Sequence, residues 1–138
     1  METMRTSGLL AVVAVFVSHA ALADVKRHKS IPAPLWGSWA LSAEACNKTD
    51  KSAIVLSAKN YVSSEANCSV DWVSETPGAR GSIYSAHLQC TGTAGRAQKT
   101  ISNVVLLPKD ANQLSIGADF SSLKVYQRCP ASEPAATR

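Results

Sequence analysis

Cysteine is the residue type with the clearest chemistry in this 138-residue chain. No two cysteines form the Cys-x-x-Cys pair of a thioredoxin-like redox centre, and their spacing is not that of a zinc site. An even number of cysteines in a small exported domain predicts two disulfides. The cysteines are Cys46, Cys68, Cys90 and Cys129.

Catalytic groups are sparse. Asp71 and His87 form the carboxylate–imidazole pair that we can place, as neighbours across a predicted hairpin. No third group converges on them, so an exposed ion pair worth less than about 1 kcal/mol is favoured over an acid–base dyad. The segments WGSWA and GSIYS are not Gly-x-Ser-x-Gly elbows, and GTAGRAQKT has its glycines misplaced for a phosphate loop. We therefore predict a protein without enzymatic activity, cofactor or metal.

Short alternating segments separated by turn residues run through most of the chain. Residues 68–75 and 82–91 alternate on either side of TPGARG, and residues 100–107 are apolar on both faces. A last segment, LKVYQRC, precedes a Pro/Ala-rich tail. This pattern predicts an all-β fold, a small antiparallel barrel or sandwich of seven or eight strands with a lipocalin-like meander.

The turn TPGARG sets the register of the predicted hairpin. Cys68 and Cys90 lie equally far from its centre, so a regular hairpin places them opposite each other. Apolar residues then meet apolar ones on the cysteine face, and polar residues meet polar ones on the other. The predicted pairs are Val70 with Leu88, Trp72 with Ala86, Ser69 with Gln89, and Asp71 with His87.

This register favours a Cys68–Cys90 disulfide and leaves Cys46 to pair with Cys129. Loop-closure entropy gives these bridges roughly 3 and 4–5 kcal/mol of stabilisation. The second bridge joins strand ends that lie at opposite rims of an eight-strand meander. Cys46 must then lie on a loop that folds back, or the strand count must be seven. The pairing of Cys46 with Cys68 and of Cys90 with Cys129 stays open.

Two surfaces are candidates for contact with another protein. Lys124, Tyr126 and Arg128 share one face of the last strand, and Tyr and Arg are enriched at interface hot spots. A solvated face that discourages edge pairing is the competing interpretation. Trp36 and Trp39 point to opposite faces, one into the core and one to a lid or contact surface. The candidate contact residues are Lys124, Tyr126, Arg128, Trp36, Asp71 and His87.

The ends of the chain predict an exported protein. Residues 1–23 read as a signal peptide, with Arg5, the apolar run GLLAVVAVFV and the cleavage site ALA, and the run is too short to span a bilayer. We predict a basic, extended lead-in at 24–34, a β-barrel domain at 35–129 and a disordered tail at 130–138. The periplasm or the exterior is the expected location, without stable membrane insertion. Because much of the net charge of +4 lies in the lead-in, no nucleic-acid partner is expected.

The order of signal peptide, Gly37-x-Trp39 and cysteine-bearing meander resembles small exported bacterial β-barrel inhibitors. One group is the periplasmic lysozyme inhibitors, including an alphaproteobacterial type, and the other is the Inh-type metalloprotease inhibitors. Gly-x-Trp also opens lipocalins. Inh-type chains usually carry one disulfide, and the loop motifs of the C-type lysozyme inhibitors are missing here, so no inhibitory residue carries over.

Three functions follow as hypotheses. The resemblance implies a non-enzymatic module that binds and inhibits a cell-wall hydrolase, foremost lysozyme, with a metalloprotease as the alternative target. The predicted barrel offers a third possibility, because some eight-strand barrels hold one small apolar ligand.

Overall fold

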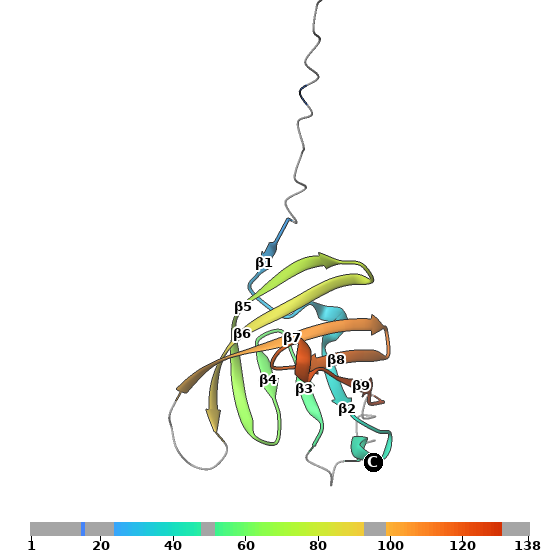
Figure 1. Ribbon diagram of the computed structural model, residues 1–138. Helices are drawn as coiled ribbons and strands as arrows, with labels where there is room; N and C mark the ends of the chain where they lie inside the picture. Colours follow the sequence, from blue (N-terminus) through green and yellow to red (C-terminus); the bar gives the residue numbers. More distant parts are fainter. Residues whose placement is uncertain (1–14, 16–23, 48–51, 93–98, 131–138) are drawn as a thin grey trace, which may run out of the picture.

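The computed structural model describes residues 15, 24–47, 52–92 and 99–130. Strands β2 to β9 pair in sequence order and β9 pairs with β2, which closes an antiparallel barrel of eight strands (Figure 1). Strand β1 adds to the edge of β5. The prediction of an all-β barrel is therefore confirmed, with eight strands. The predicted signal peptide and tail lie outside the described residues, apart from Val15 and Pro130.

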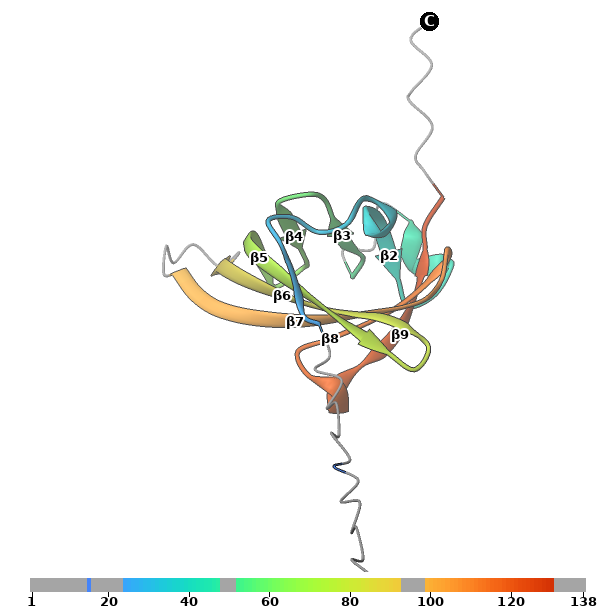
Figure 2. The same cartoon turned by 90° about the horizontal axis from the view of Figure 1, so that it is seen from above.

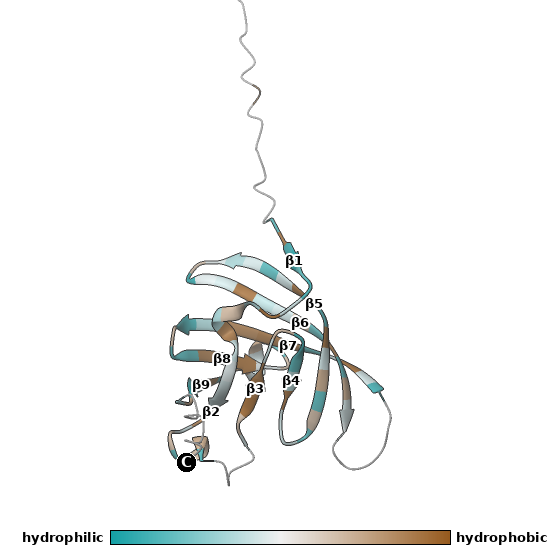
Figure 3. Ribbon diagram, turned by 180° about the vertical axis from the view of Figure 1, so that it is seen from behind, coloured by the Kyte–Doolittle hydropathy of each residue, from teal (hydrophilic) through white to brown (hydrophobic). Residues whose placement is uncertain are grey.

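The strands are β1 (Lys26–His28), β2 (Gly37–Ala40), β3 (Ile54–Leu56), β4 (Asn60–Val62), β5 (Ala66–Gly78), β6 (Gly81–Gly92), β7 (Lys99–Asp110), β8 (Gln113–Gly117) and β9 (Lys124–Arg128). Short 3-10 helices lie at η1 (Ala33–Leu35), η2 (Glu44–Cys46) and η3 (Phe120–Ser122). Viewed from above, β2, β3 and β4 lie across the barrel from β6 and β7 (Figure 2). Hydrophobic residues concentrate along β3, β7 and β8 (Figure 3).

One end of the barrel is filled by the lead-in. Ile31 is fully buried, and its amide donates to the carbonyl of Ala58 in the β3–β4 turn at 2.9 Å. Leu35 on η1 is buried too, and its carbonyl accepts from the indole Nε1 of Trp39 at 3.0 Å. The barrel core thus includes residues that precede the first barrel strand. This plug, residues 31–35, closes the end at which the β3–β4, β5–β6 and β7–β8 turns lie.

Both favoured disulfides are confirmed. Cys68 bonds to Cys90 across β5 and β6, and Cys46 bonds to Cys129, 83 positions further along the sequence. Cys46 lies on η2, which folds back onto β2 and packs with Ala40 in a small buried cluster. Cys46 therefore lies on a segment that folds back toward the end of β9, as the second disulfide requires in an eight-strand barrel.

The hairpin register holds only as far as Val70 and Leu88. A β-bulge at Asp71 then shifts the pairing by one residue, so Trp72 faces His87 and Val73 faces Ala86. The predicted pairs Trp72–Ala86 and Asp71–His87 are wrong for this reason. An unpaired extra residue reverses the alternation beyond it, which turns Val73 into the core in place of Trp72.

The orientation predicted for β9 is also wrong. Tyr126 pairs with Leu114, which is fully buried, so Tyr126 and its alternate neighbours Lys124 and Arg128 point to the inside of the barrel. Tyr126 is half-buried and packs against the core. Val125, on the opposite face of the strand, is 41% exposed. Each face of this strand combines apolar and polar groups, so either face could point inward. With Tyr126 and Arg128 inside, the tyrosine ring and the aliphatic part of the arginine side chain bury more apolar surface than Val125 would.

Arg128 fastens the plug to the barrel. Its Nη1 and Nη2 donate to the carbonyls of Trp36 at 2.7 Å and Pro34 at 2.6 Å, and its Nε donates to Ala111 at 2.9 Å. Its guanidinium carbon lies 4.3 Å from the centroid of the Trp39 ring. One side chain on the last strand thus binds the plug, the β7–β8 turn and the first barrel strand. We call these contacts the Arg128 clamp.

We expect Arg128→Ala to lower the free energy of unfolding by about 2–3 kcal/mol, because a charged donor to three carbonyls is lost. Gly37→Ala is expected to destabilise as well, since Gly37 has φ +129° and a Cβ there would lie 3.1 Å from Arg128 Nη1. Lys124→Ala, an exposed change on the same strand, serves as control and should change stability by less than about 0.5 kcal/mol. Urea unfolding with intact disulfides measures all three, and equal midpoints for Arg128→Ala and Lys124→Ala would rule out the clamp.

Candidate binding site

A cavity of about 440 Å³ opens at the end of the barrel away from the plug. Its lining includes Ser63 and Glu65 from the β4–β5 turn and Ala118 from the β8–β9 connection. In an up-and-down barrel these connections lie at the opposite end from the β3–β4 turn, which holds the plug. The molecule therefore has one filled end and one hollow end.

The cavity lining combines nearly buried apolar residues with more exposed polar ones, and its accessible surface is more polar than apolar. Leu88, Val104 and Ile116, each less than 5% exposed, lie at the inner side of the lining together with the Cys68–Cys90 disulfide. Ser63, Glu65, Ser102 and Lys124 lie around the mouth. Such an arrangement suits a molecule with an apolar body and a polar end.

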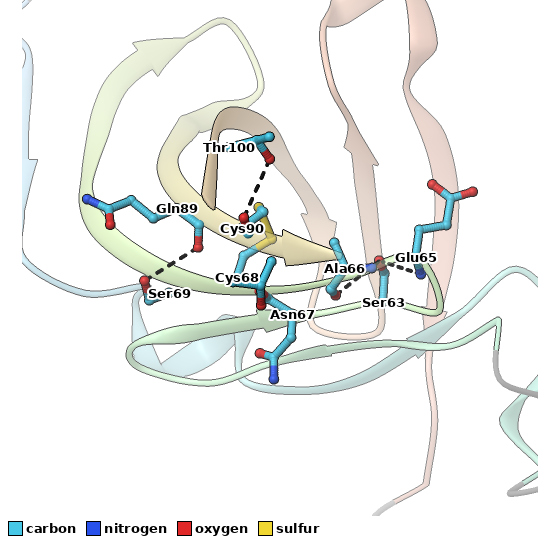
Figure 4. Close-up of a disulfide and its surroundings, with 10 residues drawn as sticks. Ser63, Glu65, Ala66, Asn67, Cys68, Ser69, Gln89, Cys90 and Thr100 are labelled. Carbon is cyan, nitrogen blue, oxygen red and sulfur yellow. Dashed lines mark hydrogen bonds between the residues drawn. A yellow bond between two sulfur atoms is a disulfide. The ribbon is translucent and has the colours of Figure 1, made fainter. Parts of the chain in front are cut away.

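The disulfide fixes the wall near the β4–β5 turn (Figure 4). That turn is tight because the Ser63 hydroxyl accepts from the amides of Glu65 and Ala66, each at 3.3 Å. Across the sheet, Ser69 donates to the Gln89 carbonyl at 3.4 Å, and Thr100 donates to the Cys90 carbonyl at 3.5 Å. The rim is thus held by covalent and side-chain bonds.

Two tyrosines face the interior of the hollow end. Tyr61 on β4 lies opposite Cys68, and Tyr126 on β9 lies opposite Leu114. Burial, and then the negative charges of ionised Tyr126 and of Glu65, raise the pKa of Tyr61 to about 12. Burial also raises the pKa of Tyr126. Both phenols thus remain neutral hydrogen-bond donors at physiological pH, and within the described part of the chain neither hydroxyl has a hydrogen-bond partner.

The outer wall carries a three-layer stack that joins β1 to the barrel. The Trp72 and His87 rings stack with centroids 3.5 Å apart and planes 19° apart. The guanidinium of Arg27 lies 3.9 Å from the Trp72 ring centroid. Next to the stack, His28 Nε2 lies 2.9 Å from Glu75 Oε1. Hydrogen bonds from Ser82, and then from His28, lower the pKa of Glu75 below its ordinary value.

The predicted contact residues do not form one surface. Lys124 and Tyr126 line the cavity, and Arg128 belongs to the clamp. His87 belongs to the outer stack, whereas Asp71 accepts from the side chain of Gln89 at 3.1 Å. An acid–base dyad between Asp71 and His87 therefore has no geometric basis.

Trp36 is the predicted lid or contact residue. It is 43% exposed, whereas Trp39 is 1% exposed, so the expected division between a core and an exposed tryptophan is confirmed. The Trp36 indole donates to the carbonyl of Ile31 at 2.7 Å, which ties it to the plug rather than to the cavity.

Sequence reasoning missed Tyr61 altogether. Its strand is only three residues long, so alternation alone could not show which way it points. The missing signal was the pairing of β4 with β5, which places Tyr61 opposite the inward-facing Cys68.

The raised pKa of Tyr61 makes a prediction about alkaline stability. Its pKa of about 12 in the folded protein lies above the ordinary value of 10.0, so the folded state holds the proton more tightly. This contribution is complete below pH 10 and is lost as the pH rises through the folded pKa. We expect the free energy of unfolding of wild type to fall by about 1–2 kcal/mol more than that of Tyr61→Phe between about pH 9 and pH 11. Urea unfolding across this range measures the difference, and parallel curves would contradict it.

The outer stack makes a prediction about strand β1. Trp72→Ala removes the ring on which Arg27 lies, so β1 should detach more often and expose Arg27 to trypsin. Limited proteolysis should cut this variant at Lys26 or Arg27 on the order of tenfold faster than wild type, an increase equivalent to about 1.4 kcal/mol. Trp36→Ala is the control, since the Trp36 indole bonds to Ile31, outside both β1 and the stack, and equal cutting of both variants would refute the role of the stack.

Within residues 24–47, 52–92 and 99–130, no three His, Cys, Asp or Glu side chains are placed to hold a metal ion. Nor does this part of the chain contain a helix long and apolar enough to cross a membrane. Comparison with protein-family models, curated proteins and solved structures finds no match to the chain. Function therefore has to be argued from the cavity itself.

Proposed function

We propose that this protein is a non-enzymatic carrier that binds a small ligand with an apolar body in its barrel. The observation that carries the proposal is the open cavity of about 440 Å³, which falls within the roughly 300–1,000 Å³ of small-molecule pockets. Eight-strand barrels either fill their interior with side chains or hold one small ligand. Here the plug and the core fill one end, and the other end stays open.

The lining defines the chemistry of the ligand. The rings of the half-buried Tyr61 and Tyr126, with the small exposed parts of Leu88, Val104 and Ile116 behind them, contact an aliphatic or aromatic body and release water from it. The neutral phenols of Tyr61 and Tyr126 donate to an acceptor such as a carbonyl, ether or carboxylate oxygen. The ligand class is therefore an apolar molecule that carries at least one hydrogen-bond acceptor.

The proposed setting is the periplasm or the cell exterior. Two disulfides fit an oxidising compartment, and the predicted signal peptide supports export. The inhibitor hypothesis, with lysozyme or a metalloprotease as target, stays a prediction. The face of Lys124, Tyr126 and Arg128, offered as one contact surface for it, points to the cavity and the clamp, so the carrier hypothesis has the stronger geometric support.

Binding of the neutral apolar dye N-phenyl-1-naphthylamine to the oxidised chain from Asp24 to Arg138 tests the proposal. We expect a saturable rise in dye fluorescence with one site per chain. Ser102→Trp, which projects a ring into the mouth from β7, should weaken dye binding by at least about tenfold. Gln127→Trp places the same ring at an exposed position on the outer side of β9 and should leave binding unchanged.

Two results would count against the carrier. Fluorescence that fails to saturate, or binding that Ser102→Trp and Gln127→Trp change equally, would show that the dye does not enter the cavity. Lysis of cell walls by a c-type lysozyme, followed in parallel, separates the alternatives. Stoichiometric loss of lysis without saturable dye binding would favour the inhibitor.

A further inference from the structure

The first half of β7 is paired on one side only. Residues from Lys99 to Leu106 pair with β6, but pairing with β8 begins only at Val105. Along residues 99–104, no described strand lies on the other side of β7. Among the described residues, this stretch of β7 is therefore an unpaired strand edge.

The direction of the backbone groups on this edge follows from the neighbouring strands. The amide of Val70 donates to the carbonyl of Lys59 at 2.8 Å, so its backbone groups point to the β4 side and away from β6. Residues opposite each other in an antiparallel pair point their groups either both inward or both outward. Leu88, opposite Val70, therefore bonds toward β7, where it faces Ser102. By alternation, the residues that present N–H and C=O groups to the free edge are Lys99, Ile101 and Asn103.

The side chains along this edge are exposed, and one is strongly apolar. Ile101 is 86% exposed, on the outer face, where it lies opposite Gln89 of β6. Thr100 and Ser102 are exposed on the inner face, the face of Cys90 and Leu88. A free edge with an exposed β-branched apolar residue at its centre is a template for another strand.

We propose that two copies of this chain associate by antiparallel pairing of their β7 edges, with Ile101 opposite Ile101 of the second copy. In this register the outward N–H and C=O groups of Lys99, Ile101 and Asn103 are all paired, because Lys99 then lies opposite Asn103 of the second copy. Shifting it by two residues in either direction leaves only two of the three paired. The proposal does not depend on a ligand in the cavity.

The edge is complementary to itself in side-chain chemistry. On the outer face, Ile101 meets Ile101, and Lys99 meets a neutral Asn103, so no like charges are opposed. On the inner face, Thr100 meets Ser102 of the second copy, and the two hydroxyls can share a hydrogen bond. Of the three described residues that present backbone groups to the edge, only Lys99 is charged, and for this reason a second copy, rather than a charged peptide, is the occupant that we infer.

Such pairing would also enlarge the binding site. Ser102 lines the mouth of the cavity, next to the free edge. A second strand at this edge would continue the sheet past the mouth and place Thr100 of the second copy beside it. Each copy would then contribute a side chain to the rim of the other.

Amide hydrogen exchange of the oxidised chain tests the proposal without altering it. Exchange is followed by NMR from about 20 µM to about 1 mM, a range that covers weak, small interfaces. We expect the Ile101 and Asn103 amides to slow on the order of fivefold as concentration rises. The Thr100 and Ser102 amides, which bond to β6, serve as internal controls and should not change with concentration. Sedimentation equilibrium should show the mass doubling over the same range.

A matched pair of variants separates this surface from others. Ile101→Pro removes the N–H that points to the free edge, which strands tolerate at an unpaired edge, and should keep the chain monomeric. Phe120→Ser removes another exposed apolar side chain, 63% exposed on η3, and should leave association unchanged.

Several outcomes would overturn the self-pairing. Wild type that stays monomeric at 1 mM, roughly the weakest measurable affinity, would do so. Association in which the Ile101 amide exchanges at a constant rate, or that persists in a folded Ile101→Pro variant, would locate the contact elsewhere. Protection of the edge amides that requires an added β-forming pentapeptide would assign the edge to another protein. If Ile101→Pro fails to fold, exchange in the wild type still decides.

Discussion

The Arg128 clamp is the constraint on which the rest of the structure depends. An eight-strand barrel has two open ends, and an interior that neither core nor ligand fills is unstable. The guanidinium holds the plug through the carbonyls of Pro34 and Trp36 and stacks on Trp39. Because these donors come from the last strand, this hold on the plug forms only once β9 pairs with β2. Closure of the sheet and filling of one end are thus linked through one side chain.

The two disulfides stabilise different parts of the barrel. Cys46–Cys129 ties η2 to the end of β9 and supports barrel closure from outside the core. Cys68–Cys90 lies in the cavity wall and fixes β5 against β6 where no plug supports them. Beyond the bulge at Asp71, β5 leaves β4 and pairs with β1 instead. A bulge increases local bending and twist, which lets one long strand serve both the barrel and the added strand.

Much of the fold could be predicted from patterns that repeat with period two. Alternation placed the strands, and the symmetric position of Cys68 and Cys90 about the turn gave both disulfides. The failures have two causes: alternation does not say which face of a strand is inside, and a bulge breaks the alternation itself. For β9 that choice depended on pairing with Leu114, and beyond Asp71 it depended on a bulge that no local residue marks. The Arg128 clamp joins residues 92 and 94 positions apart, a separation that no local pattern reports.

The cavity mouth and the free edge of β7 have a common origin in how β8 ends. β8 stops at Gly117, where an added Cβ would come within 2.8 Å of the backbone of Ser122. The absence of a Cβ at Gly117 permits this close turn, and the cap of η3 stabilises it, with the Asp119 carboxylate accepting from the Ser122 amide at 2.9 Å. β8 therefore cannot continue alongside the first half of β7, and β9 begins beyond this turn. The space that β8 would have occupied becomes the side of the mouth, and the strand that it would have paired becomes an edge. One tight turn thus accounts for both surfaces through which we propose that this protein binds.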